Sequence, residues 1–201
     1  MFIDLFNAPW LRNGVGRTFK FLSPNTWTTL SLVFAFAGLA TVASGRVTAG
    51  LLLFLWSGCC DFIDGSVAKT TGRTSKIGAF WDGTVDRFVD AMLIGCFFFL
   101  PLPVSQRTVD LVLFSLLFAT LMPPFIVAYA NHRGAVPDPT ERVIWRIAFR
   151  YEYLVTLIVA MLVLAVSPRA AWWMLLTTLV MMIATVVQSI VVAFLKAKTY
   201  S

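Results

Sequence analysis

The feature that most constrains the fold is a series of long apolar runs separated by short polar segments. Six such runs occupy most of the chain, at about residues 27–44, 47–69, 78–100, 109–130, 154–166 and 172–195. A helix needs about 20 apolar residues to cross the hydrocarbon core of a bilayer. The sequence therefore predicts an all-α integral membrane protein with six transmembrane helices. Pro123 and Pro124 lie within the fourth run, where they are expected to kink the helix or open its hydrogen bonds.

Composition excludes a soluble domain. The chain is 59% hydrophobic and 13% charged, whereas soluble domains carry roughly a quarter charged residues. Its formal net charge of +6 is compatible with nucleic-acid binding. However, the basic residues stand singly beside apolar runs and form no block or stripe, so no nucleic-acid partner is expected.

The basic residues instead predict the membrane topology. Six spans place both termini on one side, together with the second-to-third and fourth-to-fifth connections. That side holds twelve basic residues: Arg12, Arg17, Lys20, Lys69, Arg73, Lys76, Arg133, Arg142, Arg146, Arg150, Lys196 and Lys198. The other side holds three: Arg46, Arg107 and Arg169. Because basic residues favour the cytoplasm, we expect a multi-pass protein of the cell membrane with both termini cytoplasmic.

Two segments differ in character along the chain. Residues 1–23 do not span, and we interpret them as a juxtamembrane amphipathic segment; residues 24–201 form the six-helix domain. An apolar stripe at helical spacing predicts an interfacial helix in the first segment, with a frayed tail as the alternative. The stripe consists of Leu11, Val15, Phe19 and Leu22, and Arg12, Arg17 and Lys20 lie off it.

Five carboxylates interrupt the second and third apolar runs. They are Asp61, Asp64, Asp82, Asp86 and Asp90. Each charge at the centre of a spanning helix costs on the order of 2.5 to 3.5 kcal/mol, so this set indicates a functional site. At about 100° per residue, the acids of each helix share one face. The short connection predicts antiparallel neighbouring helices, whose acidic faces meet at matched depth near the cytoplasmic surface.

Such a cluster indicates a bound cation, because close carboxylates repel one another when all are ionised. Carboxylate oxygens suit Mg²⁺, Mn²⁺ or Ca²⁺, and two divalent ions would balance four negative charges. Gly65, Ala68 and Gly78 leave room beside the acids for a diphosphate, or alternatively let the helices pack closely. Asp90 lies beyond the four other acids; pairing with Arg87 is favoured over contact with a substrate.

The order of these residues resembles the signature of the CDP-alcohol phosphatidyltransferase family. The matching positions are Asp61, Asp64, Gly65, Ala68, Lys69, Gly78, Asp82 and Asp86, with Lys69 where the family usually has Arg. The resemblance extends to Pro24-Asn25-Thr26 and to the six-span layout. It implies transfer of a phosphatidyl or archaetidyl group from a CDP-linked lipid to a polar alcohol with release of CMP, by a homodimer.

The resemblance also implies roles for individual residues. Asp61, Asp64, Asp82 and Asp86 would bind Mg²⁺ or Mn²⁺, as two ions, and Asp86 would also act as the base toward the acceptor hydroxyl. The CDP and diphosphate site would comprise Asn25, Thr28, Asp61, Gly65, Ala68, Lys69, Gly78 and Asp82.

The acceptor is indicated only by the basic residues of the fourth-to-fifth connection. Arg133, Arg142, Arg146 and Arg150 could bind a phosphorylated alcohol such as inositol phosphate or glycerol phosphate, or could merely satisfy the topology. The segment from Arg150 to Leu154 is faintly similar to a pattern of phosphatidylinositol phosphate synthases.

Two other functions are compatible with the acidic hairpin. One is a CDP-choline or CDP-ethanolamine phosphotransferase acting on diradylglycerol. The other is an ion-coupled transporter, which would be expected to show paired halves, whereas the acidic hairpin has no counterpart in the second half.

Overall fold

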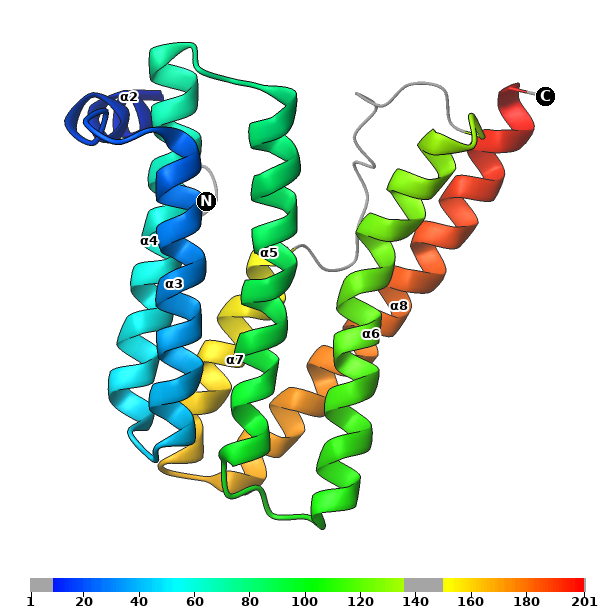
Figure 1. Ribbon diagram of the computed structural model, residues 1–201. Coiled ribbons are helices and arrows are strands. Elements are labelled where there is room, and N and C mark those ends of the chain that lie inside the picture. Colours follow the sequence, from blue (N-terminus) through cyan, green and yellow to red (C-terminus); the bar gives the residue numbers. More distant parts are fainter. Residues whose placement is uncertain (1–8, 136–149, 201) are drawn as a thin grey trace. The chain divides into compact units, whose positions relative to one another are not determined.

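The computed structural model describes residues 9–135 and 150–200, and the secondary structure of these residues is entirely helical (Figure 1). The helices are α2 (Pro9–Thr18), α3 (Pro24–Ala43), α4 (Val47–Thr71), α5 (Lys76–Cys96), the 3-10 helix η1 (Phe97–Phe99), α6 (Gln106–His132), α7 (Arg150–Leu164) and α8 (Pro168–Tyr200). The chain divides into two compact units, Met1–Cys96 and Phe97–Ser201. Every apolar run that predicted a span forms a helix.

Local sequence explains where the helices of the first unit begin and end. Ser23 is extended and its hydroxyl accepts a hydrogen bond from the backbone N–H of Thr26 at 3.2 Å, so it caps α3. Pro24 follows at the first helical turn, where its missing N–H costs nothing. Gly45, at φ +85°, allows the tight turn into α4, and Gly72, at φ +65°, ends that helix in the left-handed conformation.

Helix α3 is the central element of the first unit, since it packs against both α4 and α5. Small residues allow its backbone to approach that of α4: a Cβ atom on Gly50 would lie 2.9 Å from the carbonyl oxygen of Gly38. The buried hydroxyls of Ser31 and Ser57 hydrogen bond across the same interface at 2.9 Å. Helices α4 and α5 run antiparallel, as expected, but they make few direct contacts with each other (Figure 1).

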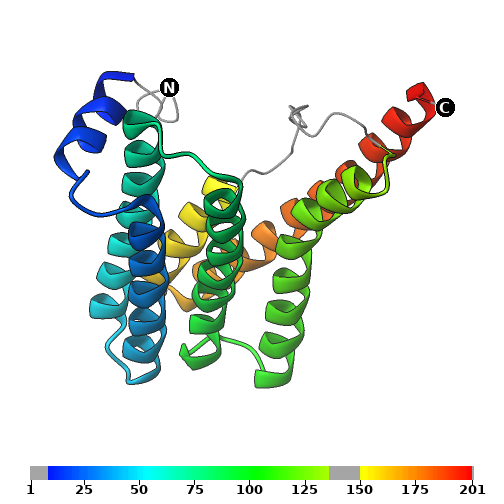
Figure 2. The ribbon, with the colours of Figure 1, turned by 45° about the horizontal axis from the view of Figure 1, so that its top comes forward.

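Helix α2 lies across the end of α4 that leads into α5 (Figures 1 and 2). Gly16 faces Thr70 and Ser66 so closely that a Cβ atom would collide with both. The predicted apolar stripe is present, and Val15, Phe19 and Leu22 pack against a protein core. That core consists of Trp27, Cys60, Ile63 and Val67. Leu11 is only half-buried, while Arg17 and Lys20 are exposed as expected.

Among the described residues, four helices are long and apolar enough to cross a membrane. They cover Pro24–Ala43, Val47–Thr71, Gln106–His132 and Pro168–Ala197. This supports a membrane-embedded, multi-pass protein. Helix α5 falls outside the set because of its charged residues, and α7 has only 15 residues. Spanning by α5 and α7, and hence the count of six, stays a prediction.

The second unit is built around α8, which packs against both α6 and α7. The hydroxyl of Ser105 caps α6 by accepting from the backbone N–H of Thr108 at 3.3 Å. Pro123 and Pro124 lie inside α6, which remains a helix through both residues. Figure 2 shows α6 changing direction along its length, in agreement with the kink expected from the prolines.

Candidate metal centre

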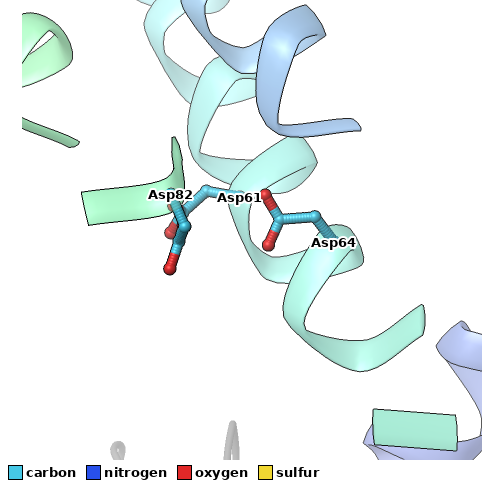
Figure 3. Close-up of side chains that lie close together, drawn as sticks. All are labelled: Asp61, Asp64 and Asp82. Atoms are coloured by element: carbon cyan, nitrogen blue, oxygen red, sulfur yellow. The ribbon is translucent and has the colours of Figure 1, made fainter. Parts of the chain in front are cut away.

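Three carboxylates from two helices converge in the first unit. Asp61 and Asp64 come from α4 and Asp82 from α5, and each offers an oxygen within 4.8 Å of those of the other two (Figure 3). Asp64 is 5% exposed, whereas Asp61 and Asp82 are half-buried. The acidic faces of the two helices therefore do meet. Asp86 is not a member of this group.

The oxygen donors of this cluster fit a divalent cation. Three carboxylates in mutual reach are hard ligands of the kind that Mg²⁺, Mn²⁺ and Ca²⁺ accept. Asp61 and Asp82 are partly exposed, so a cation and a ligand that bridges to it could enter. Carboxylates this close also repel one another when they are ionised, which is a further reason to expect a cation.

Thr28 on α3 makes a hydrogen bond to one acid of the cluster. Its hydroxyl Oγ1 lies 2.6 Å from Oδ2 of Asp64, as a buried hydrogen bond, and 3.1 Å from the carbonyl oxygen of Pro24. The sequence assigned Thr28 to the CDP site through the family resemblance. Its contact with Asp64 could not be foreseen, because nothing in the spacing shows which face of α3 meets α4.

Two other contacts join α3 to α5 near the cluster. The indole Nε1 of Trp81 donates to Oγ1 of Thr29 at 3.1 Å. A Cβ atom on Gly78 would lie 3.1 Å from Oδ1 of Asn25 and 3.0 Å from Oγ of Ser75. The structure therefore brings together Asn25 and Gly78, two residues that the sequence assigned to the CDP site.

The remaining CDP-site candidates lie along α4. A Cβ atom added to Gly65 would meet nothing within 4 Å, so this glycine borders open space. Ala68 is half-buried and Lys69 is exposed near the end of the helix. The open space beside Gly65 and the positive charge of Lys69, both toward this end of α4, suit a ligand that contains phosphate.

Asp86 and Asp90 are joined by Arg87. Its guanidinium Nη2 lies 3.2 Å from Oδ2 of Asp90 and 3.7 Å from Oδ2 of Asp86. Asp90 is fully buried, and Arg87 is partly exposed. The pairing of Asp90 with Arg87 that the sequence favoured is confirmed.

The basic residues predicted to bind the acceptor are described only in part. The Nε of Arg133 donates to the hydroxyl of Tyr129 at 3.0 Å, and its guanidinium lies 5.3 Å from the centre of that ring. Arg150 is the first residue of α7 and is half-buried. Arg142 and Arg146 lie outside the described residues.

Fold and site together define a class of protein: a helical membrane protein with a cluster of acids, able to hold a metal ion, contributed by two of its helices. The family model of the CDP-alcohol phosphatidyltransferases matches residues 21–195 of the chain. The chain therefore belongs to this family, as its signature residues indicated. It is a transferase of phospholipid biosynthesis.

Individual relatives point the same way. The chain is 30% identical over 156 residues to archaetidylinositol phosphate synthase of Pyrococcus horikoshii, covering 76% of this chain and 77% of that protein. It is 36% identical over 93 residues to phosphatidylinositol phosphate synthase of Streptomyces avermitilis, covering 46% of this chain and 35% of that protein.

A solved structure shares the fold. The crystal structure of Mycobacterium tuberculosis phosphatidylinositol phosphate synthase with CDP-DAG bound superimposes with a TM-score of 0.76 at 21% identity and covers 92% of each chain. A second structure of that enzyme, in complex with manganese and citrate, gives a TM-score of 0.75 at 22% identity and covers 92% of this chain and 87% of that chain.

Proposed function

We propose that this protein transfers a phosphatidyl or archaetidyl group from a CDP-linked lipid to a phosphorylated polyol of the inositol phosphate type, with release of CMP. The observation that carries the proposal is the convergence of Asp61, Asp64 and Asp82 from two helices within 4.8 Å. A membrane-embedded acidic centre of this kind suits chemistry on a diphosphate at the lipid surface. Family membership supplies the class of reaction.

We assign the metal site to Asp61, Asp64, Asp82 and Asp86, and propose that it takes two ions of Mg²⁺ or Mn²⁺. Two divalent cations would balance four carboxylates. When bound, such cations polarise the diphosphate and stabilise negative charge on the departing CMP. The manganese in the crystal structure of the mycobacterial enzyme supports Mn²⁺ as a usable ion here.

Asp86 is the proposed general base. In the reaction the acceptor hydroxyl oxygen forms a bond to the lipid-side phosphorus, and the bond from that phosphorus to the CMP oxygen breaks. CMP departs with the bonding electron pair, and the carboxylate of Asp86 accepts the hydroxyl proton.

The proposed CDP site lies along α4 and at the start of α3. Gly65 borders open space, and Ala68 adds little bulk on the same helix. Lys69 supplies a positive charge for phosphate, and Asn25 lies against Gly78. The presence of CDP-DAG in the structure of the mycobacterial neighbour supports a CDP-lipid as the donor.

An inositol phosphate is the acceptor we favour. Two relatives bear the names archaetidylinositol phosphate synthase and phosphatidylinositol phosphate synthase. The basic residues that would bind the acceptor phosphate are Arg133, Arg142, Arg146 and Arg150. Glycerol phosphate is the alternative acceptor that the same cations could bind.

We further propose that residues 24–201 act as one transferase domain, preceded by the juxtamembrane segment 1–23. The family model spans both compact units and so supports a single catalytic domain. The excess of basic residues on one side supports a cell-membrane location with both termini and the active site toward the cytoplasm. A homodimer is proposed by family resemblance, and light scattering of the detergent-solubilised protein tests it.

An acceptor panel tests the proposed reaction. Purified protein would receive CDP-diacylglycerol or its archaeal ether counterpart, Mn²⁺ or Mg²⁺, and one of inositol phosphate, inositol, glycerol phosphate or serine. We expect CMP release that depends on the metal and is fastest with inositol phosphate. Folded protein that releases no CMP with any donor and acceptor pair would contradict the assignment.

A further inference from the structure

Residues in the first turns of α3 make hydrogen bonds to both helices that carry the acids, α4 and α5. Thr28 reaches α4 through its hydrogen bond to Asp64, and the next residue, Thr29, accepts a hydrogen bond from Trp81 on α5. Direct contacts between α4 and α5 are few. Two consecutive residues of a third helix therefore provide polar connections to both helices that carry the cluster.

The bond between Thr28 and Asp64 is well shielded from solvent. Thr28 is 3% exposed and Asp64 is 5% exposed, and their oxygens are 2.6 Å apart. This is the short distance typical of a hydroxyl that donates to an ionised carboxylate. A carboxylate has two oxygens, so a hydrogen bond to Oδ2 restrains the orientation of the group and leaves it with acceptor capacity for a cation.

We propose that Thr28 is a positioning residue that holds the Asp64 carboxylate in the orientation required to bind a divalent cation. This inference rests on the proposed metal-dependent transfer. It changes the role that the family resemblance gave Thr28, because its hydroxyl lies closer to Oδ2 of Asp64, at 2.6 Å, than to the carbonyl oxygen of Pro24, at 3.1 Å. Hydrogen bonds to metal-binding carboxylates typically account for about 10-fold to 100-fold in metal affinity or activity.

Two substitutions that differ by one oxygen atom isolate the hydrogen bond. Both T28S and T28A remove the methyl group, but only T28S retains the hydroxyl. The matched control is T41V, because Thr41 lies on the same helix and its hydroxyl donates to the carbonyl oxygen of Ala37 at 2.6 Å. That hydroxyl is far along α3 from the carboxylates.

The measurement is Mn²⁺ affinity of the full chain without nucleotide or lipid substrate, taken from free Mn²⁺ by electron paramagnetic resonance. We expect T28A to bind Mn²⁺ about tenfold or more weakly than T28S. T28S should stay within about threefold of the unmodified protein, as should T41V. Melting temperatures of the two variants at position 28 check that the comparison is between folded proteins.

Different results would contradict the positioning role of Thr28 and the proposed metal-dependent function. Equal Mn²⁺ affinity in T28A and T28S would overturn the positioning role; if T28A then showed a raised KM for the CDP-lipid, Thr28 would be a nucleotide contact. If the unmodified, folded protein bound no Mn²⁺ and released CMP equally well in EDTA, the proposed metal-dependent function itself would fail, and the inference about Thr28 with it.

Discussion

At the scale of single residues, the acids of the hairpin divide into two sets. Asp61, Asp64 and Asp82 share one small volume, while Asp86 and Asp90 both contact Arg87. The helical periodicity of the sequence predicted which faces carry the acids, because backbone geometry fixes it. It could not predict this division, which depends on side-chain conformations and on the spacing between the helices.

Replacement of Asp86 by Asn tests whether this residue has a different role from the three clustered acids. A general base contributes about 100-fold to 10,000-fold to a rate, so we expect D86N to lower kcat for CMP release by at least about 100-fold. Asp86 is also a proposed metal ligand but stands outside the group of three acids, so Mn²⁺ affinity should fall as well, though less than in D82N. Rapid-quench assays and Mn²⁺ titrations measure the two quantities. A D86N variant with near-normal kcat would remove Asp86 as the base.

Replacement of Gly65 by Ala tests the proposed CDP site. The added methyl group meets no protein atom within 4 Å, and Ala is favoured over Gly in a helix by about 1 kcal/mol. The melting temperature should therefore be unchanged or higher. If the nucleotide occupies this space, the KM for the CDP-lipid should rise by about tenfold or more.

Gly58 provides the matched control for this substitution. It lies two turns earlier on α4, and a Cβ atom there also meets nothing within 4 Å. G58A should leave the melting temperature unchanged or higher, as in G65A, and should leave the KM unchanged. Equal KM values in G65A and the unmodified protein would move the nucleotide away from Gly65.

At the scale of elements, caps and breakers were readable from the sequence, but packing partners were not. Ser23 caps α3 by accepting from the backbone N–H of Thr26, and Pro24 follows in the first turn, where the polar segment gives way to the first apolar run. The short connection after α4 suggested a direct partnership with α5. Instead α3 packs against both, since its small residues Gly38 and Ser31 permit close approach to α4.

Helix α2 offers a prediction about element packing. Gly16 lies against Thr70 and the backbone of Ser66 without space for a Cβ atom, whereas Gly14 borders open space. G16A should displace α2 from α4, and G14A should be tolerated. Limited proteolysis of the N-terminal segment should accelerate in G16A alone. Equal cleavage rates in both variants would mean that the close contact does not hold α2 in place.

The ion pair within α5 offers a second prediction at this scale. R87Q leaves Asp90 buried without this partner and should lower the free energy of unfolding by about 3 kcal/mol. The double variant R87Q/D90N removes both charges and should recover most of that loss. Denaturation in mild detergent measures the free energy of unfolding of the unmodified protein, R87Q and R87Q/D90N. If R87Q/D90N were no more stable than R87Q, Arg87 would not stabilise the protein by compensating the charge of Asp90.

At the scale of the whole molecule, the decisive question is whether α5 crosses the membrane. Five charged residues keep it out of the set of apolar spans: Lys76, Asp82, Asp86, Arg87 and Asp90. Yet Asp82 belongs to the acidic cluster, and Arg87 contacts the two acids beside it. Charges that are paired, or that bind a cation, cost far less in a bilayer than isolated ones. We therefore expect α5 to span.

Cysteine labelling tests this topology. Thr74 precedes α5 and Gln106 begins α6, and both are exposed; T74C and Q106C would be made in a variant whose native cysteines, Cys59, Cys60 and Cys96, are replaced by Ala. If α5 spans with the acidic centre toward the cytoplasm, a membrane-impermeant maleimide should label T74C only in inverted vesicles and Q106C only in right-side-out vesicles. Retained CMP release by each variant serves as the folding control. Labelling of both cysteines from the same side would show that α5 turns back within the membrane, and the six-span topology would then be wrong.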